Sequence, residues 1–141
     1  FTDKSLFGAF SYGTYVVRDE FLAKNRDAVA DYVQGTARAI RWTQVTPRDE
    51  VVAKFREIIN KRKRNEDTKS IEYWRSSGIP VPGAVIAERE LQTWIDWLVR
   101  NGELKEGQLK AKDLYTNDLN PYANGTYPEG SGPDGKVLAH Q

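Results

Sequence analysis

The chain has 141 residues, a formal net charge of +1, 39% hydrophobic residues and 29% charged residues. This length suits one domain with a modest core. The near-neutral charge gives no electrostatic argument for nucleic acid or a membrane surface as the main partner. There is no cysteine, which excludes disulfides, thiolate metal sites and cysteine nucleophiles. There is also no methionine, even at position 1, so we expect the chain to be part of a longer or processed product.

The N-terminal part predicts one strand followed by a long helix. Residues 9–17 (AFSYGTYVV) are rich in aromatic and β-branched residues, which favours a strand. Residues 18–25 predict a short helical turn, with Asn25 as the cap of the next helix. Residues 26–45 predict that helix, because one apolar face recurs at helical spacing at Val29, Tyr32, Val33, Thr36, Ala37 and Ile40. Gly35 lies inside it, and we interpret this glycine as a site of close packing against a neighbour.

The middle of the chain predicts two further helices and a loop. Thr46 and Pro47 are expected to begin a helix, with Thr46 as its cap. Its apolar face contains Val51, Val52, Phe55, Ile58 and Ile59, and it ends in KRKRN (61–65). Residues 67–77 predict a short helix. SGIPVPG (77–83) is expected to be a loop because its prolines and glycines exclude regular structure.

The C-terminal part predicts an amphipathic helix and then a weakly apolar tail. AERELQTWIDWLVRNG (87–102) places Leu91, Trp94, Ile95 and Leu98 on one face and ends at Asn101-Gly102. Residues 105–117 contain at most a short helix or turn. Residues 122–141 are rich in Gly and Pro, and we expect a surface-wrapping or disordered tail. The predicted fold class is therefore mainly α, with one N-terminal strand and about five helices.

The sequence offers no arrangement of residues suited to catalysis. The only histidine is His140, close to the end of the predicted tail, where a general base would be poorly positioned. One histidine and no cysteine also make a zinc site improbable. GAFSYGTY (8–15) has glycines at phosphate-loop spacing, but Thr14 stands where that loop needs a lysine. We therefore expect no enzyme activity, no metal and no cofactor.

Other charged and aromatic clusters have simple structural explanations. The KRKRN segment suits a solvated helix end, where cations interact favourably with the helix dipole. The carboxylates of the amphipathic helix are expected on its solvated polar face; they belong to Glu88, Glu90, Asp96 and Glu103. Trp94 is expected to pack in the core, although Trp42, Trp74, Trp94 and Trp97 could instead form an aromatic ligand platform.

Three residues of the predicted strand are candidates for ligand binding. Tyr12, Thr14 and Tyr15 place hydroxyl groups and aromatic rings beside Gly13, as many ligand clefts do. Strand alternation would put Tyr12 and Thr14 on one face and Tyr15 on the other. Ordinary strand pairing and packing is the alternative explanation.

Two longer stretches, taken together, resemble one protein family. Residues 15–52 contain a strand ending in a V-R-x-x-F run, an Asn-initiated helix and a Pro-initiated helix. Residues 90–121 contain a Trp-bearing helix, an N-G-x-L stop and a D-L-Y-T-N ending. In this order they resemble the C-terminal part of substrate-binding proteins of nitrate/sulfonate/taurine-type ABC importers. The resemblance covers roughly residues 10–121.

The resemblance implies a fold and a function. Family members have two α/β lobes, of the periplasmic-binding-protein type, that close around a ligand without chemistry. Residues 1–121 would be the C-terminal helical portion of one lobe, with the return strand near 9–17, and 122–141 an added tail. The protein would be periplasmic or extracellular, lipid-anchored or soluble. It would capture a small anionic solute such as a sulfonate, taurine or nitrate for a membrane permease, with Tyr12, Thr14 and Tyr15 near the cleft.

Two further possibilities follow from the residues themselves. A stand-alone helical interaction module could bind protein or nucleic acid through the Trp-bearing helix or KRKRN, whereas a small enzyme is the poorest interpretation. A single strand needs a partner, so an exposed strand edge near 9–17 would favour self-association.

Overall fold

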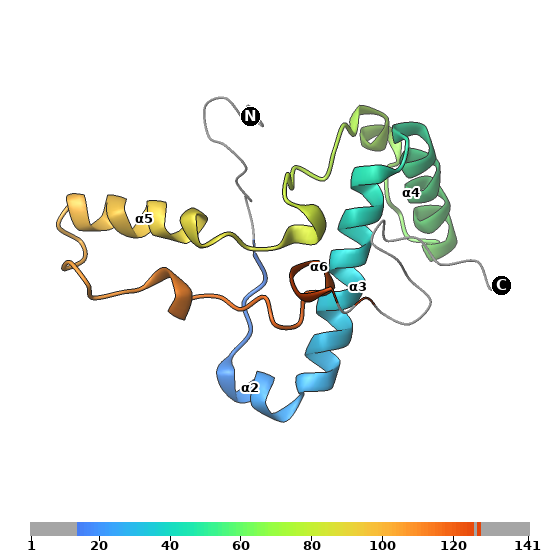
Figure 1. Ribbon diagram of the computed structural model, residues 1–141. Helices are drawn as coiled ribbons and strands as arrows, with labels where there is room; N and C mark the ends of the chain where they lie inside the picture. Colours follow the sequence, from blue (N-terminus) through green and yellow to red (C-terminus); the bar gives the residue numbers. More distant parts are fainter. Residues whose placement is uncertain (1–13, 126, 128–141) are drawn as a thin grey trace.

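The computed structural model describes residues 14–125 and residue 127 (Figure 1). The described residues form helices and turns and contain no strand. The α-helices are α2 (Asp19–Lys24), α3 (Arg26–Val45), α4 (Arg48–Arg62), α5 (Glu88–Arg100) and α6 (Pro121–Asn124). Short 3-10 helices lie between them: η1 (Lys69–Tyr73), η2 (Pro82–Ala84) and η3 (Ala111–Asp113). The predicted mainly-α class is confirmed.

The predicted strand is wrong where the structure describes it. Residues 14–17 have no regular secondary structure, and residues 9–13, including Tyr12, lie outside the described residues. A strand forms only when its backbone is paired. No backbone hydrogen bond joins residues 14–17 to another described residue. The β-branched residues of this segment therefore favour an extended backbone, but no described segment pairs with it to form a sheet.

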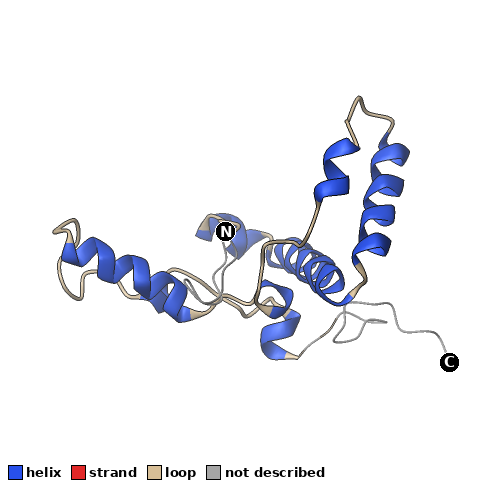
Figure 2. Cartoon of the chain, turned by 90° about the horizontal axis from the view of Figure 1, so that it is seen from above, coloured by secondary structure: helices blue, strands red, loops and turns tan. Residues whose placement is uncertain are grey.

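The long helix α3 lies between two projecting units (Figures 1 and 2). On one side, α4 and η1 form a helical hairpin; on the other, α5 and the returning chain form an arm. Buried apolar side chains among the described residues are few: Ala37, Val51, Val52, Ile95 and Ala111. Val51 and Val52 confirm part of the predicted apolar face of α4, whereas Ile58 on that face is exposed. Gly35 is exposed, and a Cβ added there would meet nothing within 4 Å. Our close-packing interpretation of this glycine is therefore wrong among the described residues.

One of the two predicted helix caps is confirmed in position and the other is wrong. Asn25 occupies the N-cap position of α3, but its side chain donates to the Phe21 carbonyl oxygen of α2, at 3.0 Å, instead of capping α3. Thr46 ends α3, because its backbone N–H donates to the Trp42 carbonyl oxygen at 3.0 Å. Its buried Oγ1 has no hydrogen-bond partner among the described residues. Pro47, with no side-chain hydrogen bond, occupies the cap position of α4.

The arm consists of α5 folded against its return segment. Gly102 has a φ of 75° at the end of α5, and its N–H donates to the Val99 carbonyl oxygen at 3.0 Å, which confirms the predicted Asn101-Gly102 stop. Ile95 of α5 and Ala111 of the return segment are both buried, and α5 packs against η3. Trp94 is 54% exposed, so its predicted core role is wrong. Ile95 is therefore covered, whereas Trp94 and Trp97 are left 54% and 45% exposed.

The remaining predictions for this region are partly confirmed. Residues 67–77 form only the 3-10 helix η1, whereas residues 105–117 contain the expected short helix, η3. Glu90 is buried, contrary to our expectation of a solvated carboxylate. The predicted tail begins inside α6, and most of it lies outside the described residues. In the part of the chain that is described, no helix is both long and apolar enough to cross a bilayer.

Candidate functional site

The loop before α5 is held by one glutamine side chain from α3. Gln44 donates through Nε2 to the carbonyl oxygens of Ile79 and Val81, at 2.8 and 2.9 Å. Its Oε1 accepts a hydrogen bond from the Gly83 N–H at 3.3 Å. A proline-rich loop cannot satisfy its own carbonyl groups by regular pairing, so a side-chain donor must do so. One amide therefore fixes three backbone groups of the SGIPVPG loop.

Two asparagines hold the same region from the C-terminal side. Asn120 donates through Nδ2 to the Gly83 carbonyl oxygen at 2.9 Å, in a buried position. Its Oδ1 accepts from the Tyr122 N–H at 2.9 Å and so caps α6. Asn117 donates to the Ile86 carbonyl oxygen at 2.8 Å and accepts from the Ile86 N–H at 3.0 Å. We call Gln44, Asn117 and Asn120 the amide clamp.

The clamp encloses a backbone turn that requires glycine. Gly83 is buried and has φ 57° and ψ 23°, in the left-handed region. A Cβ placed there would lie 2.1 Å from Cδ2 and 2.5 Å from Cγ of the Tyr122 ring. The next residue, Ala84, also has a positive φ, 59°. The close approach of the ring and the backbone conformation together exclude a side chain at Gly83.

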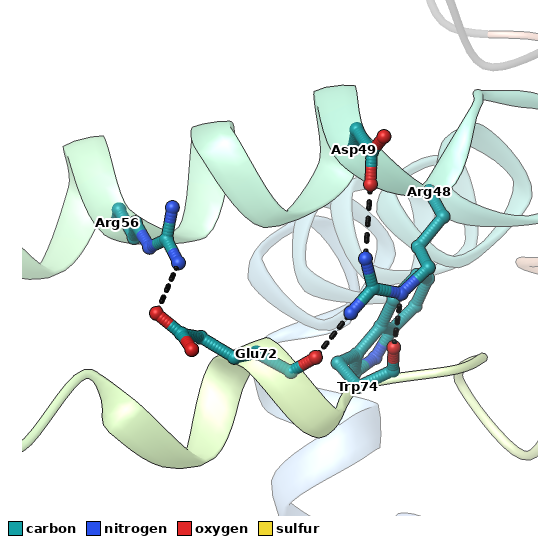
Figure 3. A network of polar contacts seen from close by, with 5 residues as sticks. All are labelled: Arg48, Asp49, Arg56, Glu72 and Trp74. Atoms are coloured by element: carbon teal, nitrogen blue, oxygen red, sulfur yellow. Dashed lines mark hydrogen bonds and ion pairs between the residues drawn. The ribbon is translucent and has the colours of Figure 1, made fainter.

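A second polar network fixes η1 against the start of α4 (Figure 3). The Arg48 guanidinium donates through Nε to the Trp74 carbonyl oxygen at 2.8 Å and through Nη2 to the Glu72 carbonyl oxygen. Its Nη1 pairs with Asp49 Oδ1 at 2.9 Å, and Arg56 pairs with the Glu72 carboxylate at 2.8 Å. All three Arg48 nitrogens are engaged within the fold. This network holds η1 against α4, and the Arg48 guanidinium is not available to bind a ligand.

The charged end of α4 is also paired internally. Lys54 and Lys61 contact the Glu57 carboxylate at 2.9 and 2.5 Å. Hydrogen bonds from Lys54 and Lys61 lower the pKa of Glu57 to about 2. Arg62 lies 3.5 Å from Glu66. These pairs agree with our interpretation of the KRKRN segment as a solvated helix end.

Two open clefts lie on the described surface. One, about 740 Å³, lies between α3 and α4 and is lined by Gly35, Trp42, Phe55 and Ile58 among others. The other, about 640 Å³, lies between α5 and its return segment and has Ile95 and Ala111 in its lining. Neither cleft includes Thr14 or Tyr15. The described residues hold no cluster of three or more metal-ligating side chains.

Of the three predicted ligand residues, Tyr15 lies beside α3. Tyr15 is 73% exposed, and its ring meets the edge of Tyr32 at 5.2 Å between centroids, with the planes at 87°. A hydrogen bond with Tyr15 raises the pKa of Tyr32. Thr14 is exposed, and Tyr12 is not among the described residues. Tyr15 is thus brought against α3, and neither Tyr15 nor Thr14 lines either cleft.

The sequence reasoning missed all three amides of the clamp as fixed contacts. Asn117 and Asn120 lie inside the DLYTNDLNP stretch that carries part of the family resemblance, and that stretch was the available signal. Gln44 gave no signal, because its position on α3 does not reveal the loop that it binds. Comparisons of the chain with family models, curated proteins and solved structures found no match.

Proposed function

We propose that this chain is the C-terminal segment of an extracytoplasmic solute-binding protein. In this proposal the complete receptor captures a small anionic solute, such as a sulfonate, taurine or nitrate, and delivers it to an ABC permease. The mechanism is closure of two lobes around the ligand, a hinge motion without covalent chemistry. Tyr12, Thr14 and Tyr15 stay our candidates for the ligand side of the segment.

The observation that carries the proposal is the large apolar surface left uncovered among the described residues. Five hydrophobic side chains and Pro121 are buried there, whereas twelve large hydrophobic side chains are more than one third exposed. So many exposed large side chains for so small a buried core favour a further covering surface. Val16 is 91% exposed within a backbone stretch that has no described partner. A surrounding receptor lobe would cover these side chains and pair this backbone.

The stretches that carry the family resemblance also contain residues that end a helix or hold a loop. The N-G-x-L stop ends α5 at Asn101 and Gly102. The loop before α5 is bound by Asn117, the last residue of the D-L-Y-T-N ending, and by Asn120, three residues later. Residues with such roles are needed to hold one arrangement of helices, so their order in the sequence favours a shared fold. This support is structural, and the nature of the solute comes from the resemblance alone.

Isothermal titration tests the proposal directly. The complete product of the reading frame that contains this chain would be titrated with taurine, alkanesulfonates and nitrate, and with a neutral sugar as control. We expect micromolar binding of at least one anion by the complete protein and little or none by the 141-residue chain. Failure of the complete protein to bind any of these anions would refute the proposed solute class. Micromolar binding by the 141 residues alone would refute the fragment proposal.

A stand-alone interaction module is the second candidate function. Trp94 and Trp97 are 54% and 45% exposed and meet edge to face, with centroids 6.5 Å apart. Tryptophan is enriched in protein-binding hot spots, so this pair favours a protein partner over nucleic acid. Fluorescence anisotropy with labelled DNA and RNA at two salt concentrations discriminates further: binding that collapses with added salt would favour the nucleic-acid alternative.

A further inference from the structure

The arm stands apart from the rest of the described fold. We define the arm as residues 87–116, that is, α5, its C-terminal turn and the return segment with η3. Among the described elements, α5 packs substantially against η3 alone. Figures 1 and 2 both show the arm extending away from α3 and α4. Among the described residues, the arm is therefore joined to the body of the molecule mainly through its two connecting segments.

Both connecting segments are fixed on the body side of the arm. Before the arm, Gln44 and Asn120 hold the loop as far as Gly83. After the arm, Pro121 is buried and Asn120 caps α6. These contacts stop the loop and α6 from moving relative to α3. Any rotation of the arm must consequently take place between these anchored points and the first turn of α5.

One side chain joins the two connecting segments at this point. Asn117, on the outgoing segment, exchanges two hydrogen bonds with the backbone of Ile86 on the incoming segment, at 2.8 and 3.0 Å. The pair is partly buried. A side-chain amide that bonds both the N–H and the C=O of one residue imitates an antiparallel backbone pair. It therefore fixes both the separation and the orientation of the two segments.

We propose that the arm is a lever hinged at its base and that Asn117 is the residue that fixes its angle. The hinge comprises residues 84–87 and 114–118, and the lever between them consists of α5 packed against η3. With 13 residues, α5 is about 20 Å long. A rotation of about 20° at the base would move its far end by about 7 Å. Such a rotation carries the exposed pair Trp94 and Trp97 relative to α3. This inference does not depend on the proposed function.

Paired spin labels measure the lever directly. Because the chain has no cysteine, Glu103→Cys at the far end of the arm and Asp31→Cys on α3 provide two unique labelling sites. We expect a single narrow distance distribution in the otherwise unchanged chain. Asn117→Ala should broaden it and spread it over several ångströms. A distribution in Asn117→Ala as narrow as that of the parent would overturn the proposal, and so would an equally broad distribution in the parent.

A matched control separates the hinge from general loosening. Asn101→Ala also removes an asparagine, but an exposed one whose side chain, among the described residues, bonds only the Trp97 carbonyl oxygen inside the arm, at 2.7 Å. We expect its label distances to match those of the parent. Equal broadening in Asn101→Ala and Asn117→Ala would show that Asn117 has no special role in fixing the angle.

Two further measurements decide the question if Asn117→Ala fails to fold. Asn117→Asp keeps the acceptor for the Ile86 N–H and loses the donor to the Ile86 carbonyl, so it should broaden the distances to a smaller extent. Asn117→Leu keeps the approximate side-chain volume and removes both hydrogen bonds, so the Ile86 amide should exchange its hydrogen faster in this variant than in the unchanged chain, by roughly 2- to 10-fold. Identical exchange rates together with identical distances would overturn the proposal.

Discussion

Replacing Gly83 with alanine should strongly destabilise this fold. Gly83 is buried at φ 57° against the Tyr122 ring. An L-residue in the left-handed region costs roughly 1–2 kcal/mol. The added Cβ would also lie 2.1, 2.5 and 2.9 Å from three atoms of the ring. These atoms include Cγ, so the ring cannot avoid the methyl group by moving its far end alone.

The two costs add to a measurable total. Forcing an extra methyl group into packed surroundings costs about 1–3 kcal/mol. Together with the backbone cost, we expect Gly83→Ala to lower the free energy of unfolding by about 2–5 kcal/mol. Urea unfolding followed by circular dichroism and by tryptophan fluorescence measures this loss.

Gly102→Ala is the control that separates the two costs. Gly102 has φ 75°, but a Cβ there would meet nothing within 4 Å, so only the backbone cost of roughly 1–2 kcal/mol applies. Adding Tyr122→Ala to Gly83→Ala should recover the steric part of the loss in a double-mutant cycle. The reasoning is refuted if Gly83→Ala costs no more than Gly102→Ala, or if the cycle shows no coupling between Gly83 and Tyr122.

Three other perturbations test the contacts around the site. Gln44→Leu removes three hydrogen bonds to partly buried backbone groups and should cost about 1–3 kcal/mol in urea unfolding; a loss below about 0.5 kcal/mol would contradict the clamp. Arg48→Lys cannot reproduce the bonds of the guanidinium fork and should cost about 1 kcal/mol, with an unchanged unfolding midpoint as the contrary result. The pKa of Glu57 is lowered to about 2, so the stabilisation from its ionised form is complete above its ordinary pKa and disappears as pH falls towards 2. Carboxyl NMR titration should show this low pKa and its rise in a Lys54→Ala/Lys61→Ala variant; an ordinary pKa in the parent would count against the ion pairs.

The local sequence patterns predicted most helices and missed the contacts between them. The apolar spacing that includes Ala37 identified α3, and the Asn101-Gly102 stop identified the end of α5, because both signals arise within a few residues of chain. The prediction of a strand at 9–17 was wrong for its described residues, because a strand needs a backbone partner and composition does not show whether one exists. The predicted core position of Trp94 was wrong, because helical spacing defines an apolar face but does not show how much of that face a neighbouring segment covers.

The sequence by itself determined the mainly helical class and the absence of cysteine chemistry. These properties depend on residue type and on spacing along the chain. Only the tertiary structure decided that Gln44, Asn117 and Asn120 meet at one loop, with partners 31–39 residues away. Hydrogen bonds over such separations depend on where the helices direct their side chains in space. The same is true of the arm, whose exposed tryptophans follow from what the return segment leaves uncovered.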